Sequence, residues 1–420
     1  MTKRAVKRRT ILAGTLGNAL EWYDFAIYGF MAPILGQAFF PAEDKVASLL
    51  AAFGVFAVGY AARPVGAILF GHLGDRFGRK PALLISMISM GATSLAIGLM
   101  PDHSQIGTAA AFVLVTLRVI QGLSVGGEYG SSIVFMAEHA PPARRAFFAS
   151  LPQCGSLSGF LVGSALSSFI AGQVGNEAMV AWGWRIPFLF GALAAVFGII
   201  LRSKLTEPPG ITRLDRGAGL PLVVALSGHW RTMLRLVILM MGGGIGFYLM
   251  AIYAASYLTE QMHLSTAKAL EINTLGLLAM LLVTPPAAIL SDRIGRNPML
   301  YGVAIGGLVL GWPLWWLMHQ DAFALIVAGQ IGLALIFGVT FAVVPAVITE
   351  HLPSQIRCSG ASVSYNFCLG LFGGTTPLVA TYLVARTADD FAPIYYFMAV
   401  ALLQFIALIG LKEMAGKPLS

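Results

Sequence analysis

Residues 71–80 read Gly71-His72-Leu73-Gly74-Asp75-Arg76-Phe77-Gly78-Arg79-Lys80, and a partial copy, Asp292-Arg293-Ile294-Gly295-Arg296-Asn297-Pro298, begins 217 positions after Asp75. A second pair of segments repeats as well. Glu138-His139-Ala140-Pro141, followed by Arg145, returns 212 positions later as Glu350-His351-Leu352-Pro353, followed by Arg357. Two repeats at nearly equal offset indicate a duplicated unit, an arrangement that is found in membrane transporters.

The composition is that of a membrane protein. Of the 420 residues, 57% are hydrophobic and 11% are charged, and the mean hydropathy is +0.78. Soluble domains carry about 25% charged residues. The composition therefore excludes a water-soluble enzyme, a disordered protein, a coiled coil and a disulfide scaffold. The three cysteines, Cys154, Cys358 and Cys368, form no pattern typical of a metal site or of a disulfide framework.

Apolar stretches of about 20 residues, long enough to cross a bilayer as a helix, recur along the whole chain. Twelve are predicted as transmembrane helices, at 11–38, 47–72, 81–100, 108–136, 146–172, 183–202, 232–259, 266–291, 298–318, 322–350, 358–384 and 392–412. The longest polar loop divides them into six and six. The sequence thus predicts an N-terminal six-helix bundle (1–202), a linker loop (203–231) and a C-terminal six-helix bundle (232–420).

The positive charges are distributed unequally between the two sides of the predicted membrane. Of the 27 Lys and Arg residues, 21 fall in or beside loops on one side and 4 on the other, while Arg63 and Arg118 fall inside helices. Cytoplasmic loops carry the excess of Lys and Arg, so both termini are expected in the cytoplasm of a multi-pass protein of the inner membrane. The net charge of +8 therefore indicates topology, and nucleic acid is not an expected partner.

The segments quoted above resemble a known family. The stretch 71–80 matches the loop 2–3 signature of the major facilitator superfamily, and further segments resemble its metabolite:proton symporters. These are Gly17-Asn18 with Glu21-Trp22-Tyr23-Asp24-Phe25, Arg63-Pro64-Val65-Gly66, Arg118 to Gly122 through Gly126-Gly127-Glu128, and Trp182 to Phe188. The resemblance implies the major facilitator fold, an all-α membrane protein of twelve transmembrane helices in two pseudo-symmetric six-helix bundles. Relatives of this kind carry 2-oxoglutarate, citrate, shikimate, proline or betaine with protons.

Charged residues inside a membrane helix are costly and are functional candidates by default. Glu21 and Asp24 lie three residues apart in the first predicted helix, with Asn18 and Tyr28 on the same face. We expect at least one of the two carboxylates to bind and release the coupled proton, Asp24 first, paired with Arg118 of the fourth helix. Proton-coupled sugar porters of the superfamily place an aspartate and an arginine at similar positions. A structural ion pair is the alternative.

Substrate contacts are expected from polar residues near the middle of the membrane. Arg63 precedes Asp75 by 12 residues, which places it about 18 Å along the helix. It could hold a substrate carboxylate through two hydrogen bonds or pair with an acid of the first helix. The other candidates are Asn18, Tyr28, Arg118, Gln121, Gln153, Tyr253, Tyr257, Tyr365 and Asn366. Helix packing is the alternative for each of the uncharged ones.

A third group is expected to gate the cytoplasmic side. Asp75 could face the positive end of a helix, and Arg79 could bridge to an acid such as Glu138. Arg76 belongs to the same signature. Glu128 could relay protons, although membership of this charge network is the favoured interpretation. The matching group in the second half is Asp292, Arg296 and Glu350. Such contacts would close one state and break as the two halves move.

The functional prediction is a proton-coupled symporter that imports a small organic carboxylate, such as 2-oxoglutarate or citrate, by alternating access. The alternatives are a proton symporter for a zwitterion such as proline or betaine, and a non-coupled facilitator. No HExxH or P-loop motif is present, so an enzyme is not expected and no cofactor or metal is predicted besides the proton gradient. The expected partners are the substrate, protons and membrane lipid, for a monomer.

Overall fold

The computed structural model describes residues 3–77, 79–125, 128–203 and 228–419, and this part of the chain is helical without any β-strand. The helices of the N-terminal half are α1 (Lys3–Phe30), α2 (Ala32–Phe39), α3 (Lys45–Ala61), α4 (Arg63–Phe77), α5 (Arg79–Leu99), α6 (His103–Ile106), α7 (Thr108–Val125), α8 (Glu128–Glu138), α9 (Arg145–Ala178) and α10 (Arg185–Ser203). Those of the C-terminal half are α12 (Trp230–Tyr248), α13 (Ala254–Glu260), α14 (Thr266–Ile294), α15 (Arg296–Leu317), α16 (Phe323–His351), α17 (Arg357–Cys368), α18 (Thr376–Thr387) and α19 (Ala392–Leu408).

The twelve predicted transmembrane segments correspond to these helices. Within the described residues, nine helical segments are long and apolar enough to cross a membrane, and two shorter apolar helices lie at Arg185–Ile200 and Ala392–Leu408. The α1–α2 segment, which carries the acids of the first predicted helix, makes the twelfth. The all-α membrane architecture expected from the sequence is therefore confirmed.

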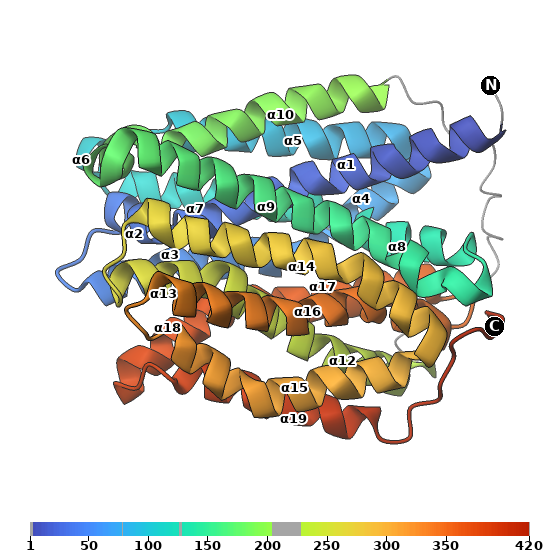
Figure 1. Cartoon of the computed structure of the whole chain (residues 1–420). Helices are drawn as coiled ribbons and strands as arrows, with labels where there is room; N and C mark the ends of the chain where they lie inside the picture. The colour runs from blue at the N-terminus through green and yellow to red at the C-terminus, as the bar shows by residue number, and fades with distance from the viewer. Residues whose placement is uncertain (1–2, 78, 126–127, 204–227, 420) are drawn as a thin grey trace.

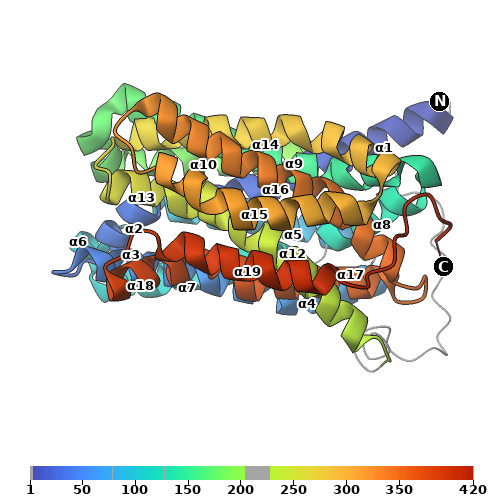
Figure 2. The same cartoon turned by 60° about the horizontal axis from the view of Figure 1, so that its bottom comes forward.

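The long helices run side by side from one end of the molecule to the other (Figure 1). The N-terminal half, blue to green, lies above the C-terminal half, yellow to red, and α9 and α14 pack against each other between them. The start of α1 and the segment after α19 lie at the same end, as the second view also shows (Figure 2). We call this end, where α9 begins and α16 ends, the gate end. The predicted linker, 203–231, falls mostly outside the described residues.

Several spans consist of two helices joined inside the bundle. The α1 helix gives way to α2 at Met31, and a proline occupies the first turn of α2. A π-helical turn, Leu249–Tyr253, joins α12 to α13, and another, Leu369–Gly373, follows α17. Such turns are often found at functional sites because they break the regular hydrogen-bond ladder. At the gate end, Gly295 separates α14 from α15 with φ of 108°, a left-handed conformation that glycine adopts without strain.

Glycines allow the helices of each half to approach closely. A Cβ atom on Gly122 of α7 would collide with the carbonyl oxygen of Gly59 in α3. A Cβ atom on Gly159 of α9 would collide with the carbonyl oxygen of Ala19 in α1. Small residues at helix contacts are the usual means of tight packing in membranes, since lipid tails are as apolar as the core side chains. These contacts position α1, α3, α7 and α9, the helices of the N-terminal half that carry most of the site.

Candidate functional site

A cavity lies where the two halves meet. Its lining residues come from α1, α8 and α9 in the N-terminal half and from α12, α16 and α17 with the following turn in the C-terminal half. They are Trp22, Tyr129, Gln153, Ser156, Leu157, Phe160, Met240, Gly243, Gly244, Phe247, Tyr248, Thr340, Phe341, Val344, Pro345, Ile348, Tyr365, Cys368 and Leu369. The volume of this cavity is about 30 Å³. None of these lining residues carries a charge.

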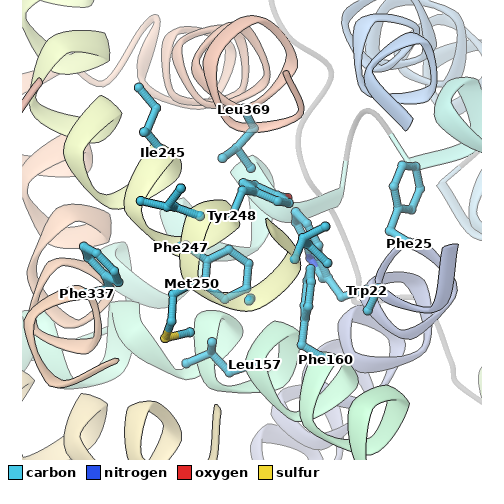
Figure 3. Close-up of a cluster of buried hydrophobic side chains, with 14 of the residues drawn as sticks. Trp22, Phe25, Leu157, Phe160, Ile245, Phe247, Tyr248, Met250, Phe337 and Leu369 are labelled. Atoms are coloured by element: carbon cyan, nitrogen blue, oxygen red, sulfur yellow. The ribbon is translucent and has the colours of Figure 1, made fainter. Parts of the chain in front are cut away.

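Aromatic rings form much of the cavity wall. The ring of Phe160 lies 5.7 Å from that of Trp22 and 4.8 Å from that of Phe247, between centroids. Phe247 in turn lies 5.2 Å from Tyr248 and 5.1 Å from Phe341. Trp22, Phe160 and Tyr248 converge on one space in Figure 3, although they belong to three different helices. Both halves of the protein thus contribute rings to the cavity wall.

Polar groups of the wall gather around a tyrosine pair. The rings of Tyr129 in α8 and Tyr365 in α17 are stacked with centroids 3.9 Å apart, so this contact joins the two halves. The hydroxyl of Tyr129 donates a hydrogen bond to the side-chain oxygen of Gln153. Gln153 and Tyr365 are therefore the two predicted substrate contacts that the structure brings to the cavity wall.

Arg63 lies behind the cavity wall. Its guanidinium carbon is 4.6 Å from the ring centroid of Trp22 and 5.2 Å from that of Tyr60, and the residue is 1% exposed. Within the described part of the chain, its Nε and Nη1 atoms have no hydrogen-bond partner. The indole ring of Trp22, a residue of the cavity wall, thus lies in contact with a buried positive charge, a cation–π arrangement that is strengthened by low solvent access.

A second charged cluster is buried within the N-terminal half. The guanidinium of Arg118 donates to the side-chain oxygen of Gln121 over 2.8 Å, and the amide of Gln121 donates to the Ser94 hydroxyl over 3.0 Å. The Asp24 carboxyl interacts with the Ser94 hydroxyl and with the charge of Arg118. The cluster therefore unites Asp24 and Arg118, the pair expected from the sequence.

Aromatic rings enclose this cluster. The Arg118 guanidinium carbon lies 4.2 Å from the ring centroid of Tyr28 and 4.8 Å from that of Phe25. Asp24 is 3% exposed and Arg118 is fully buried. Arg118, Gln121 and Tyr28 are thus absent from the cavity wall, and Gln121 and Tyr28 contact the Arg118 guanidinium. Their proposed roles in substrate contact or proton coupling remain predictions.

The other predicted substrate contacts lie away from the cavity wall. Asn18 donates to the carbonyl oxygen of Pro152 over 2.9 Å and to the Ser156 hydroxyl over 3.0 Å. The side-chain amide of Asn366 donates within its own helix, to the Ser362 carbonyl oxygen. Glu21 is 3% exposed and is also absent from the lining. Asn18 thus contributes to the contact between α1 and α9.

Tyr253 and Tyr257 belong to a different aromatic group. The Tyr253 ring is stacked on Trp315 with centroids 6.2 Å apart, and Tyr257 lies 5.7 Å from the same tryptophan. This group packs α12–α13 against α15, within the C-terminal half. Helix packing accounts for both side chains in the described conformation.

At the gate end, acidic and basic groups join the two halves. The Asp292 carboxylate accepts hydrogen bonds from the backbone N–H groups of Ala146 and Phe147, over 2.9 and 3.0 Å, at the start of α9. An anion is stabilised there by the positive end of the helix dipole. Arg296 contacts Asp292 at 2.9 Å and binds both carboxylate oxygens of Glu350. Asp292, Arg296 and Glu350, which the sequence grouped together, thus form one contiguous network.

Two further ion pairs cross between the halves. Arg145 lies 3.0 Å from Glu350, and both side chains are buried. Arg357 lies 2.8 Å from Glu138, whose side chain is 40% exposed. The sequence suggested a partner for Glu138 in Arg79. The side chains of Asp75, Arg76, Arg79 and Glu128 lie outside the described part of the structure. Within the described part, Glu138 forms its ion pair with Arg357.

The segment after α19 is bound to the same network. The Glu413 carboxylate accepts from the backbone N–H of Asn297 at 2.8 Å and of Ala415 at 2.9 Å. Burial alone would raise the pKa of the Glu413 carboxyl, but these hydrogen bonds and the charge of Arg296 hold that pKa below its usual range. The carbonyl oxygen of Lys417 accepts from Arg145 at 3.0 Å. The segment thus connects the start of α15 with α9.

The aromatic cavity wall was not predicted from the sequence. Trp22 was quoted for its motif but was not considered as a contact, and Phe160, Phe247 and Tyr248 were not singled out. One signal was available, because Phe247 and Tyr248 follow the glycine-rich run 242–246, where helices approach closely. In the described residues, no group of three or more His, Cys, Asp or Glu side chains is arranged to hold a metal ion.

Comparison with known proteins identifies the family to which this architecture belongs. Residues 14–377 match the family model described as Major Facilitator Superfamily. The chain is 34% identical over 424 residues to the glycine betaine/proline/ectoine/pipecolic acid transporter OusA of Dickeya dadantii, covering 98% of this chain and 84% of that protein. It is also 34% identical to the proline/betaine transporter of Escherichia coli strain K12, covering 98% of this chain and 85% of that protein.

Solved structures agree with the fold. A partially occluded inward open structure of the xylose transporter XylE from E. coli is 18% identical in sequence and superposes with a TM-score of 0.76, over 98% of this chain and 99% of that chain. The family model and the relatives at 34% identity define the chain as a multi-pass membrane transporter. It belongs to the Major Facilitator Superfamily.

Proposed function

We propose that this protein is a proton-coupled symporter that imports a zwitterionic solute of the proline or betaine kind. The central cavity carries the substrate in this proposal, and Asp24 with Arg118 carries the proton coupling. The relatives at 34% identity, which are named as proline and betaine transporters, support the substrate class. The single observation that carries the proposal is the cavity between the halves, with its aromatic and uncharged wall.

The charge of the cavity wall favours a zwitterion over an organic acid. A citrate or 2-oxoglutarate anion would be buried with its net negative charge against uncharged side chains, and an uncompensated buried charge is strongly unfavourable. A zwitterion has no net charge and needs only local partners for its two poles. Arg63 and Arg118, which motivated the carboxylate prediction, are both absent from the wall. We therefore prefer the zwitterion alternative to the carboxylate of the sequence analysis.

Proton coupling would follow from the buried cluster in the N-terminal half. In the charged state, Asp24 interacts with Arg118 and Ser94 inside a ring-lined space. Protonation of the carboxylate removes its attraction for the guanidinium, so Arg118 gains freedom to change partners. Because Arg118 lies against Tyr28 and Phe25 of α1, such a change would be transmitted to the helix that also carries Trp22 of the cavity wall. Glu21 is the second candidate for the protonated group.

Transport would proceed by alternating access, with the halves rocking about the cavity. The gate-end network of Asp292, Arg296, Glu350 and Arg145 would close that side and break when it opens. We expect the gate end to face the cytoplasm, with both termini on that side of the inner membrane and the protein acting as a monomer. No cofactor is expected besides the proton gradient.

Uptake by the purified protein in liposomes tests this function. The probes are radiolabelled glycine betaine, proline, 2-oxoglutarate, citrate and shikimate, each with an imposed inward proton gradient and with the gradient collapsed by a protonophore. Gradient-dependent accumulation of betaine or proline supports the proposal. Accumulation of an acid alone would return the assignment to the carboxylate. Counterflow of betaine without any response to the gradient would identify a non-coupled facilitator instead.

A further inference from the structure

The cavity wall has two kinds of aromatic surface, which differ in their electrostatic surroundings. Trp22 is already paired with a cation on one face, since Arg63 lies 4.6 Å from its ring centroid. Among the described side chains, no Lys or Arg makes such a contact with Phe160, Phe247 or Phe341. No described cation therefore competes for the negative faces of Phe160, Phe247 and Phe341, while the Trp22 side of the cavity lies next to a buried positive charge.

Two buried polar atoms of the wall have no hydrogen-bond partner in the described structure. They are Nε1 of Trp22, in α1, and Oγ1 of Thr340, in α16. Trp22 is 3% exposed and Thr340 is 1% exposed. A buried N–H without an acceptor has lost its hydrogen bonds to water, which carries a desolvation cost. A bound acceptor would remove this cost, and the indole nitrogen can act only as a donor.

The two observations together indicate which side of the cavity would hold each charged group of a zwitterion. We propose that the substrate carboxylate accepts a hydrogen bond from Nε1–H of Trp22, on the side of Arg63, while the substrate ammonium lies against the faces of Phe160 and Phe247. Thr340 supplies a second donor, from the other half of the protein. This assignment rests on the proposed transport of zwitterions and adds the orientation of the substrate and the residues that select it.

The orientation predicts a preference for methylated ammonium groups. A quaternary ammonium has no N–H to satisfy and spreads its charge over methyl groups, so aromatic faces are good partners for it. A primary ammonium loses hydrogen bonds to water when it leaves solution, and ring faces replace them poorly. Affinity is therefore expected to rise along the series glycine, sarcosine, N,N-dimethylglycine and glycine betaine.

The first experiment measures this series on the wild-type protein. Dissociation constants are determined for the four compounds by calorimetry on protein in detergent micelles, with choline as a cation that lacks the carboxylate. A rise in affinity of at least tenfold from glycine to glycine betaine is expected. Equal affinity for all four would overturn the assignment of the ammonium to the rings, whether or not any variant folds.

The second experiment separates the two poles. Trp22→Phe keeps a ring and removes the N–H, so it should weaken glycine betaine about tenfold while leaving choline and the methylation order unchanged. Phe160→Leu should abolish the rise in affinity from glycine to glycine betaine. Phe160→Tyr keeps an aromatic ring and should preserve that rise. Phe337→Leu is the matched control, because Phe337 is a fully buried ring that packs on Phe397 outside the cavity wall. It is labelled apart from the converging rings in Figure 3.

The outcomes distinguish this inference from the proposed function. If Trp22→Phe weakens choline as much as glycine betaine, or if Phe160→Leu leaves the methylation order intact, the pole assignment is wrong although proton-driven uptake of betaine persists. If the wild-type protein binds none of the four zwitterions and accumulates an organic acid, the proposed function itself fails.

Discussion

Arg145, at the start of α9, donates a hydrogen bond of 3.0 Å to Glu350, at the end of α16, and so joins the two halves of the protein. The duplicated counterparts make the reciprocal contact, with Arg357 at 2.8 Å from Glu138. Each repeated Glu thus pairs with the Arg of the other repeat. The two contacts differ in burial, because the Glu350 side chain is fully buried and that of Glu138 is 40% exposed.

This difference predicts unequal effects on the gate. Glu350 binds both Arg145 and Arg296, so Glu350→Gln removes one charged partner from each of two buried guanidinium groups, while Arg296 keeps its contact with Asp292. We expect it to favour opening of the gate end on the order of tenfold, since a charged hydrogen bond contributes about 1.5–3 kcal/mol. Glu138→Gln, the matched variant, should have a smaller effect because water can replace the contact.

Cys368 provides the measurement for these gate variants. It is buried in the cavity wall, so its alkylation by a maleimide reports opening. The experiment uses a background in which Cys154 and Cys358 are replaced by Ser. Faster labelling of Glu350→Gln than of Glu138→Gln is expected. Equal labelling of both variants and the wild type would contradict a gating role for the network.

Asp24→Asn should abolish accumulation of substrate against its gradient, because the amide cannot take up and release a proton. Exchange of labelled for unlabelled substrate should persist, since it needs no net proton movement. Asp44→Asn is the control, because Asp44 caps α3 through the Val46 N–H at an exposed site. Both activities are measured in liposomes. Normal accumulation by Asp24→Asn would remove this residue from coupling and make Glu21 the next candidate.

Gly122→Ala should reduce the stability of the folded protein. Its added methyl group would collide with the backbone carbonyl of Gly59, so α3 and α7 would have to separate. Overpacking of this kind costs about 1–3 kcal/mol. Gly54→Ala is a matched control in α3, because a Cβ atom there meets nothing within 4 Å. Thermal unfolding followed by size-exclusion chromatography compares them, and similar midpoints for the two variants would argue against the close α3–α7 contact.

Glu413→Gln should destabilise the protein at neutral pH and have less effect in acid. The folded-state pKa of Glu413 is depressed, so its carboxylate stabilises the folded state above the unfolded-state pKa. That stabilisation is lost as the pH falls through the folded-state pKa. Because the carboxylate caps the start of α15, a loss of about 1 kcal/mol is expected at pH 7.

Thermal midpoints of wild type and Glu413→Gln from pH 7 down to about pH 3, below the ordinary pKa of a glutamate, provide the check. The difference between them should narrow as the pH falls. A constant difference over this range would show that the carboxylate charge is not what binds this segment to α15.

The sequence by itself determined the membrane class, the twelve spans and the duplication, because these depend on local composition and on repeated motifs. It also grouped Asp292, Arg296 and Glu350, because these residues lie in repeated segments that match the signature motifs of the first half. The placement of Asp24 and Arg118 in one buried cluster was anticipated in the same way, although the enclosure of Arg118 by Tyr28, Phe25 and Gln121 was not.

Only the tertiary structure decided which side chains line the cavity and which partners cross between the halves. Trp22, Phe160 and Phe247 come from helices separated by many residues, and nothing in their local sequence distinguishes a cavity-facing ring from a packed one. Arg63 was expected to hold a substrate carboxylate or to pair with an acid of the first helix, and in the structure the indole ring of Trp22 lies against its guanidinium. Helical periodicity fixes only the face on which a residue lies, whereas helix rotation and closest approach determine what that face meets, and these depend on packing over the whole bundle.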